Sequence, residues 1–278
     1  MEYSQHTYPV HSPMSSVLIS PEQLEGLTYP LYVSPKLNGI RAYFDYDGVL
    51  RTKSRKLIPN AYIRSTLGGY SNLPLDGEVI AGDTFEETKS NVMTDYKKCI
   101  FTFYVFDWIS KGIYSERLAD LMLNIDTYTK CIVKVIRPFQ CFTPNEVLEA
   151  YNRFAAEPYP SGEGIVLRSR RGLYKPGRST VIEQYALKMK AIETDTAIIA
   201  EVVPLVEGGV TRDAVGSLRC VMPGTGHVFH IGTGFEVQQR YELFQKGLVG
   251  RTVTYSYLPA CSKDGLPSQA VFVKLGEL

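Results

Sequence analysis

Apolar and polar positions in the first part of the chain alternate in short runs that predict strands joined by tight turns. Residues 41–44 and 49–54 flank Asp45-Tyr46-Asp47-Gly48, and an Asp-Gly pair between two such runs is typical of a β-hairpin. Residues 75–81 and 99–108 predict two more strands, the second buried because of its apolar content. In residues 187–190 two lysines alternate with leucine and methionine, so a strand here places both lysines on one face.

Two helices are predicted among these strands. One covers about residues 115–125. The other starts at Thr143-Pro144-Asn145-Glu146, which combines an N-cap residue, proline at the first helical position and a glutamate three residues after the cap, and it continues over residues 147–156. This mixture of strands and helices predicts an α+β domain.

After Lys190 the pattern changes to short β-rich runs. Strands are expected at residues 197–203, 217–222, 228–231, 252–257 and 270–275, with one helix at about 235–246 that Gly247 closes. Short strands with a single helix fit a small OB-type barrel, a fold that commonly holds nucleic acids. We therefore expect two domains, residues 1–192 and residues 193–278, as the length of 278 residues also suggests.

Composition narrows the class of protein. Hydrophobic residues make up 44% and charged residues 21% of the chain, which is typical of a globular protein with a substantial core. Residues 1–17 lack the basic start and apolar stretch of a signal peptide, and no apolar run is long enough for a membrane span, so we expect a cytoplasmic protein without a membrane partner. Five cysteines without a C-x-x-C pair, and four histidines without metal-ligand spacing, argue against a disulfide framework and a zinc site.

The net charge of +1 does not by itself indicate a nucleic-acid partner, but the basic residues are clustered. One cluster contains Arg51, Lys53, Arg55, Lys56 and Arg64, and the other contains Arg168, Arg170, Arg171, Lys175 and Arg178, followed by Lys188 and Lys190. Such clusters on a near-neutral chain suggest a focused phosphate-binding surface. Charge alone leaves solvated strand faces as an equal alternative.

Five segments carry candidate chemistry. They are Lys36-Leu37-Asn38-Gly39-Ile40-Arg41, Leu75-Asp76-Gly77-Glu78, Tyr104-Val105-Phe106-Asp107, Gly162-Glu163-Gly164-Ile165-Val166-Leu167-Arg168 and Leu187-Lys188-Met189-Lys190. Each is short and weakly specific alone. Their order and content resemble motifs I, III, IIIa, IV and V of the covalent nucleotidyltransferase superfamily, which contains ATP-dependent ligases and mRNA capping enzymes. In addition, residues 174–180 resemble the Y-K-x-G-R-S-T segment of small viral and phage DNA ligases, and residues 215–235 resemble their barrel.

The resemblance implies an α+β nucleotidyltransferase (adenylation) domain followed by a small all-β OB-fold domain, acting as an ATP-dependent DNA ligase. Lys36 would be the nucleophile, with Lys188 and Lys190 as catalytic cations. A free lysine has a pKa of about 10.4, and nearby cations would favour the neutral amine that attacks phosphorus. The implied nucleotide pocket consists of Ser34, Lys36, Arg41, Arg55, Glu78, Phe106, Glu163, Lys188 and Lys190.

Further roles follow from the same resemblance. Glu163 and Glu78 would hold Mg²⁺ or Mn²⁺, and Phe106 would stack on adenine. Arg41, Arg55 and Arg178 would bind nicked double-stranded DNA, because a guanidinium matches phosphate geometry. The implied reaction has three steps. Lys36 would attack ATP and release pyrophosphate, AMP would be transferred to a DNA 5′-phosphate, and the adjacent 3′-hydroxyl would displace AMP and seal the strand. We expect a monomer.

Three features depart from the family pattern. Asn38 replaces the usual aspartate of motif I, which keeps an acceptor but removes a charge. The C-terminal segment, residues 265–274, lacks the usual arginine, for which Lys274 or Arg251 would have to substitute. Residues 204–214 form a loop too short for the insertion that closes around the duplex in some small ligases, so we expect no such latch.

Several alternatives stay open at this level. Glu78 can be read as a turn cap, Phe106 as core and Arg168 as an internal ion-pair partner. An RNA ligase or a GTP-using capping enzyme shares the same motifs. An inactive nucleic-acid-binding module is disfavoured because the nucleophile, the metal carboxylate and the paired lysines are all present. An NAD-dependent ligase is disfavoured because its extra N-terminal domain and cysteine zinc module are missing.

Overall fold

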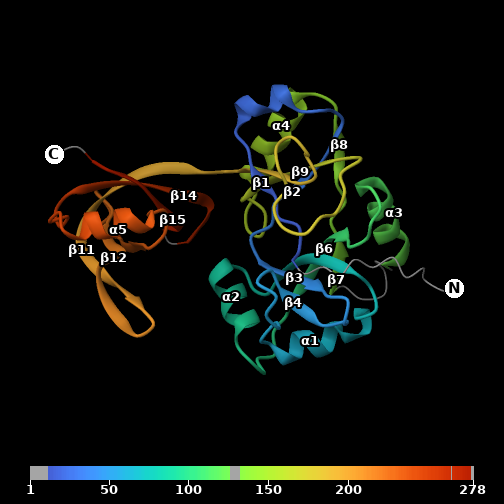
Figure 1. The fold of residues 1–278 in the computed structure, drawn as a ribbon, viewed down its shortest axis with the longest axis horizontal. Coiled ribbons are helices and arrows are strands. Elements are labelled where there is room, and N and C mark those ends of the chain that lie inside the picture. The colour runs from blue at the N-terminus through green and yellow to red at the C-terminus, as the bar shows by residue number, and fades with distance from the viewer. Residues whose placement is uncertain (1–11, 126–131, 264, 277–278) are drawn as a thin grey trace. The chain divides into compact units, whose positions relative to one another are not determined.

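The computed structural model describes residues 12–125, 132–263 and 265–276 (Figure 1). The chain divides into two compact units, Met1–Lys190 and Ala191–Leu278, which we call unit 1 and unit 2. The boundary expected from the sequence, after residue 192, lies two residues further along the chain. The first strand of unit 2 begins at Glu193.

Unit 1 contains two five-stranded sheets. The first has the order β1 (Val17–Leu18), β10 (Leu187–Lys190), β9 (Gly164–Ser169), β2 (Leu31–Pro35) and β8 (Phe139–Cys141). The second has the order β4 (Leu50–Thr52), β3 (Ile40–Phe44), β5 (Leu75–Ile80), β6 (Thr102–Trp108) and β7 (Val133–Val135). Residues 36–39 connect β2 to β3, and therefore pass from one sheet to the other.

Each sheet packs on helices through a separate apolar core. Buried side chains of the second sheet, such as Leu75, Val79 and Phe103, form one cluster with the buried faces of α1 (Ala61–Leu67), α2 (Phe85–Met93) and α3 (Tyr114–Asn124). Those of the first sheet pack on η1 (Pro21–Gly26) and α4 (Pro144–Ala155), which buries Val147, Ala150 and Phe154 along one face. Each fully buried aliphatic or aromatic side chain contributes about 1.5–3 kcal/mol to folding.

The elements with strong local signals are confirmed. The hairpin after β3 is present, and α4 begins after Thr143, whose side chain accepts a hydrogen bond from the Glu146 amide at 3.2 Å. Strand β6 starts at Thr102, three residues later than the apolar run suggested. Helices α1 and α2 were not predicted, although Asn60 and Thr84 cap them, because both are short and bury few apolar side chains.

Unit 2 consists of β11 (Glu193–Glu207), β12 (Val210–Val221), β13 (Val228–Ile231), α5 (Val237–Phe244), β14 (Thr252–Lys263) and β15 (Leu266–Leu275). The sheet order is β13-β12-β11-β14-β15. A parallel bridge between Thr233 and Val271 links the segment after β13 to β15 and closes the sheet into a barrel. This is the small β-barrel with one helix that the sequence predicts.

The expected loop at residues 204–214 is instead part of a long β-hairpin. Strands β11 and β12 continue to Glu207 and Val210, and only Gly208 and Gly209 form the turn. Both glycines have positive φ, 59° and 81°, which a two-residue type I′ turn requires. The consecutive glycines therefore extend the hairpin rather than interrupt it.

Arg240 of α5 contacts the main chain of β12 and of the segment that follows β13. Its guanidinium donates to the carbonyl oxygens of Val215 at 2.5 Å, Gly216 at 2.9 Å and Gly232 at 2.9 Å. A Cβ atom on Gly216 would lie 2.5 Å from the Pro204 carbonyl oxygen, so no side chain fits there. The close approach of the Pro204 carbonyl oxygen explains why glycine is needed at position 216.

Within the described residues, no helix is long and apolar enough to cross a membrane. Cys99, Cys141 and Cys220 are free thiols, and the other two cysteines, Cys131 and Cys261, lie outside the residues whose side chains are described.

Candidate active site

A pocket opens between the two sheets of unit 1. It is lined by Met14, Ser16, Ser34, Pro35, Lys36, Leu37, Arg41, Glu78, Phe106, Ile136, Val166, Arg168 and Ala186. These residues come from strands of both sheets and from the segment that precedes β1. Of the nine residues predicted for the nucleotide pocket, five line it directly: Ser34, Lys36, Arg41, Glu78 and Phe106.

Lys36 lies at the end of β2, and its ammonium contacts a buried carboxylate. Its Nζ is 2.5 Å from Oε2 of Glu163, and Lys190 Nζ is 2.8 Å from Oε1 of the same side chain. The Lys36 amide donates to the Gly164 carbonyl oxygen at 2.9 Å, which fixes the loop before β9 against the end of β2. Glu163 is 4% exposed. Two lysines therefore share one buried carboxylate, with the candidate nucleophile on one oxygen.

Lys188 lies beside this group without a carboxylate partner among the described residues. Leu187 and Met189 of β10 point into the core, so Lys188 and Lys190 share the opposite face, as the alternation predicts. Burial, followed by the positive charges of Lys36 and Lys190, lowers the pKa of Lys188 to about 8. The site thus concentrates positive charge where a polyphosphate would be stabilised.

Glu78 of β5 lines the pocket and is partly buried. Burial raises the pKa of its carboxyl to about 7, an effect that the charges of Lys36 and Arg41 oppose and that of Glu163 reinforces. Glu78 does not merely cap a turn, since it lies within the strand. A nearby cation would favour its ionised form.

The raised pKa of Glu78 predicts how stability depends on pH. Between its ordinary value of 4.5 and about 7 the folded state binds more protons than the unfolded state, so stability falls as pH rises through this window, by at most about 3 kcal/mol. Urea unfolding followed by fluorescence at pH 4.5–7.5 measures it. Glu78→Gln is expected to flatten this slope, and the exposed Glu86→Gln to leave it unchanged. An unaltered slope in Glu78→Gln would contradict the assignment.

Phe106 lies in the pocket wall between two guanidinium groups. The Cζ of Arg41 is 4.8 Å and that of Arg168 is 5.3 Å from the centre of its ring. These cation–π contacts fix the orientation of the ring, which lines the pocket. The ring is therefore accessible to a ligand in the pocket, and is not simply core.

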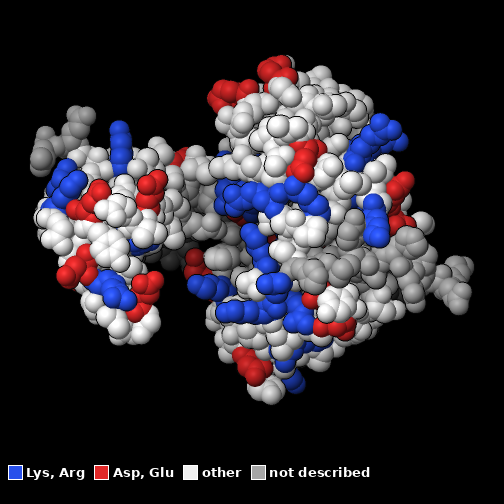
Figure 2. Space-filling view, in the orientation of Figure 1, with Lys and Arg blue, Asp and Glu red and all other residues white. Residues whose placement is uncertain are grey.

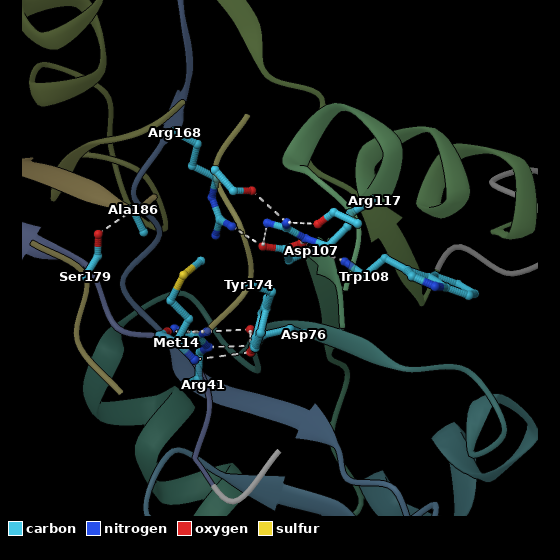
Figure 3. A network of polar contacts seen from close by, with 12 residues as sticks. Met14, Arg41, Asp76, Asp107, Trp108, Arg117, Arg168, Tyr174, Ser179 and Ala186 are labelled. Atoms are coloured by element: carbon cyan, nitrogen blue, oxygen red, sulfur yellow. Dashed lines mark hydrogen bonds and ion pairs between the residues drawn. The ribbon is translucent and has the colours of Figure 1, made fainter. Parts of the chain in front are cut away.

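Asp76 fixes the position of the Arg41 guanidinium. Its Nε and Nη2 donate to the two carboxylate oxygens at 2.6 and 2.5 Å, and Nη2 also donates to the Met14 carbonyl oxygen at 3.0 Å (Figure 3). Asp76 is fully buried and accepts a further hydrogen bond from the Tyr174 hydroxyl at 2.7 Å. Arg41 thus lines the pocket with a guanidinium whose position is fixed by these hydrogen bonds.

Arg168 belongs to a second buried network rather than to a surface cluster. It donates to Asp107, whose carboxylate also accepts from Arg117 Nε at 2.8 Å (Figure 3). Burial alone would raise the pKa of Asp107, but Arg117 and Arg168 hold it below its ordinary value. The reading of Arg168 as an internal ion-pair partner is correct, and the second basic cluster is smaller than the sequence suggests.

Other basic side chains are also paired. Lys175 contacts Glu183 at 2.5 Å, and Arg51 contacts Asp45 and Asp47. Arg55 and Arg178, predicted to bind DNA, are exposed and lie outside the pocket lining, and neither forms an ion pair within the described part of the chain. Figure 2 shows lysine and arginine side chains gathered on the visible face of unit 1. Only part of the two predicted clusters is therefore available to an external phosphate.

The residues present fit a divalent cation of the magnesium type. Glu163 and Glu78 supply hard oxygen ligands, and because burial raises the pKa of the Glu78 carboxyl to about 7, a bound cation would favour its ionised form. No group of three or more His, Cys, Asp or Glu side chains that could hold a metal ion is found among the described residues. Two carboxylates suffice for Mg²⁺ when phosphates and waters complete its shell.

The structure shows where the residues that depart from the family pattern lie. Asn38 is buried, and its main-chain N–H donates to the Pro160 carbonyl oxygen at 2.9 Å. Arg251 in unit 2 donates to the Gly276 carbonyl oxygen at 3.3 Å, and Lys274 on β15 is exposed. Arg251 thus has a structural contact that the sequence did not indicate.

Sequence reasoning missed three residues around the pocket: Met14, Asp76 as the support of Arg41, and Tyr174. Asp76 and Tyr174 stood within quoted motifs, but nothing in the pattern said which partners they would contact. Met14 carried no signal at all, because it lies in a segment without periodicity.

Comparison with known proteins agrees with this geometry. Residues 208–275 match the DNA ligase OB-like domain family. The DNA ligase of Haemophilus influenzae is 26% identical over 246 residues, which cover 86% of this chain and 84% of that enzyme. A DNA ligase of African swine fever virus is 26% identical over 182 residues, 60% of this chain but only 42% of the viral protein.

Solved structures extend the likeness to nearly the whole chain. A crystal structure of Chlorella virus DNA ligase-adenylate is 28% identical with a TM-score of 0.58, covering 97% of this chain and 99% of that one. A structure from a study of DNA binding by Lig E DNA ligases has a TM-score of 0.73 at 24% identity, covering 96% and 100%, and supports the fold. The resemblance indicated by the sequence is confirmed: the chain has the nucleotidyltransferase and OB-fold domains of the ATP-dependent DNA ligases.

Proposed function

We propose that this chain is an ATP-dependent DNA ligase that seals nicks in double-stranded DNA through a covalent lysyl-AMP on Lys36. One observation carries the proposal. At the pocket between the sheets, Lys36 and Lys190 occupy the two oxygens of the buried Glu163. A lysine nucleophile at the pocket, with a second cation and a carboxylate beside it, supplies the groups that this reaction needs.

In the first step the Lys36 amine attacks the α-phosphorus of ATP. A nitrogen–phosphorus bond forms, the bond between the α-phosphorus and the bridging oxygen to the β-phosphate breaks, and pyrophosphate leaves. The ammonium must first lose a proton, and Oε2 of Glu163, 2.5 Å from Nζ, is within reach to accept it. Lys188 and Lys190 are placed to neutralise the charge that develops on the phosphate.

The second and third steps use the same site. A DNA 5′-phosphate oxygen attacks the phosphorus of lysyl-AMP, which returns the electron pair to the Lys36 nitrogen. The adjacent 3′-hydroxyl then attacks the 5′-phosphate, a phosphodiester forms, and AMP leaves. All three steps are in-line displacements at phosphorus, so one cluster of cations serves each of them.

A divalent cation, Mg²⁺ or Mn²⁺, would neutralise phosphate charge in these steps. Glu163 and Glu78 would hold it from the protein side. Removal of divalent cations by a chelator is therefore expected to stop label uptake from ATP.

The DNA partner is assigned to the exposed cations of unit 1. Arg55 and Arg178 are exposed and form no ion pair in the described part of the chain, so they can bind backbone phosphates without losing an internal partner. Arg41, already bound to Asp76, would shape the pocket and contact the phosphate of AMP or of the nick. We assign the active species as a monomer, because one copy of unit 1 contains every proposed site residue.

The decisive test is a sealing assay with the full chain. With ATP and Mg²⁺, α-labelled ATP is expected to label the protein, and the label to pass to a 5′-phosphorylated nicked DNA duplex that is then sealed. A parallel nick in RNA tests the RNA-ligase alternative, and α-labelled GTP tests the capping alternative. Sealing of RNA alone, or labelling by GTP but not ATP, would replace the proposal with the corresponding alternative. Absence of any labelling or sealing would reject it.

A further inference from the structure

The segment Met14–Ser16, before the first strand, forms one wall of the pocket. Met14 and Ser16 line it, and Met14 is only 2% exposed. The Met14 side chain points between the two buried charge networks, toward the Arg168 guanidinium (Figure 3). A residue remote in sequence from every motif thus closes part of the pocket.

Hydrogen bonds fix both the N–H and the carbonyl groups of Met14 and Ser15. The Met14 amide donates to the Tyr174 hydroxyl at 3.3 Å, and its carbonyl oxygen accepts from Arg41 Nη2 at 3.0 Å. Next to it, the Ser15 amide donates to the Gly177 carbonyl oxygen at 2.7 Å, and the Ser15 carbonyl oxygen accepts from the Ser179 amide at 2.8 Å. The segment is anchored to residues 174–179, a stretch that follows β9.

The residues that line the pocket differ in burial. Ser34, Met14, Arg168 and Ala186 are buried, whereas Lys36 and Glu78 are partly exposed. When the α-phosphorus of a nucleotide lies at Lys36, the rest of the lining, which includes Met14, Phe106 and Arg168, is left for its sugar and base. The base, as the apolar and planar part of the nucleotide, belongs where burial is greatest.

We infer that Met14 contacts the nucleobase and determines nucleotide specificity, and that Tyr174 is the positioning residue that holds Met14 in place. This inference rests on the proposed function and adds a specificity-determining residue to it. The thioether side chain is unbranched and polarisable, and therefore fits closely against the edge or face of a purine. Its position, rather than a polar contact, sets the space available to the base.

The Tyr174 hydroxyl joins the segment to the support of Arg41. It donates to Asp76 Oδ2 at 2.7 Å while it accepts from the Met14 amide. Burial raises the pKa of Tyr174 well above its ordinary value, so the hydroxyl keeps the proton that it donates. Loss of the hydroxyl leaves the buried Met14 amide without this acceptor and releases one of the two bonds that fix Met14.

The first test is truncation of Met14 with a matched-volume control. Rates of lysyl-AMP formation are measured against ATP and GTP concentration for the wild type, Met14→Ala and Met14→Leu. Met14→Ala is expected to raise the KM for ATP about 10- to 100-fold and to reduce the preference for ATP over GTP at least about 5-fold, because one to three methylene-sized contacts are lost. Met14→Leu is expected to stay within about threefold of the wild type in both quantities.

The second test removes only the Tyr174 hydroxyl. Tyr174→Phe is expected to raise the KM for ATP about 5- to 20-fold with kcat within about threefold, whereas a general loss of structure would lower kcat and the melting temperature together. Tyr185→Phe is the matched control, since Tyr185 packs against the same buried cluster but does not line the pocket. It is expected to behave as the wild type.

The two tests separate this inference from the proposed function. If the wild type forms lysyl-AMP but Met14→Ala and Tyr174→Phe keep the wild-type KM and nucleotide preference, the inference is overturned and the ligase assignment stands. If the wild type forms no lysyl-AMP from ATP, the proposed function fails first. Should Met14→Ala not fold, the preference of Tyr174→Phe for ATP over GTP decides the question, because weaker support of Arg41 through Asp76 would act on the phosphate that both nucleotides share.

Discussion

A Lys36→Ala variant is expected to take up no label from α-labelled ATP, a loss of at least about 10³-fold relative to the wild type. Lys36 Nζ contacts Glu163 Oε2, whereas Lys190 Nζ lies 2.8 Å from the other oxygen, Oε1. Within the described part of the chain, no second lysine amine therefore takes the position of the nucleophile. A denaturing gel after incubation with Mg²⁺ measures the covalent adduct directly. Bound AMP must first be removed from the protein so that unlabelled adduct does not hide the result.

Lys36→Arg is the matched control for charge. It keeps a cation opposite Glu163, but a guanidinium stays protonated and cannot act as a nucleophile, so this variant is also expected to be inactive while it remains folded. In Lys36→Ala the buried Glu163 retains Lys190 as a partner, so that fold is expected to persist as well. Label on either variant would show that another residue carries the AMP and would reject Lys36 as the nucleophile.

The largest effect on stability is expected for Asp107→Asn. The carboxylate is fully buried and compensates two buried guanidinium groups, Arg117 and Arg168. An amide of the same shape keeps an acceptor but removes the charge, and a buried charge that loses its partner costs about 3–5 kcal/mol. For a unit of this size that corresponds to a fall in melting temperature on the order of 10 °C.

Trp108 gives a direct measurement of this effect. It is the only tryptophan in the chain, it is 7% exposed, and its amide donates to Asp107 Oδ1 at 2.9 Å, so its fluorescence follows the unfolding of unit 1 alone. Asp83→Asn, at an exposed position of the same unit, serves as the control and is expected to change stability by less than about 0.5 kcal/mol. A loss of under about 1 kcal/mol in Asp107→Asn would mean that the network contributes little to the fold.

Catalysis and stability are linked through this network. Arg168 contacts both Asp107 and the ring of Phe106, so the buried ion pair also fixes a wall of the pocket. In Asp107→Asn the KM for ATP is therefore expected to rise along with the loss of stability. The sequence could place Phe106 and Asp107 side by side in one motif, but not show that one supports the other through an arginine of a different strand.

The sequence by itself determined the elements whose signals are local. A hairpin with Asp-Gly at its turn and a helix that begins with Thr143 and Pro144 depend on neighbouring residues only, and both are present. The alternation of Lys188 and Lys190 with buried side chains likewise depends on strand geometry alone. The order of the motifs was sufficient to identify the resemblance to nucleotidyltransferases, since order survives where identity is low.

Only the tertiary structure decided which charges meet. Lys36 and Glu163 are far apart in sequence, yet they share a short ion pair because β2 and β9 are neighbours in one sheet. The same packing takes Arg168 out of the presumed phosphate surface and into the core, and brings Met14 against the pocket. Local patterns report the period and caps of each element, whereas partners across a fold follow from strand order and burial, which no single segment of the sequence contains.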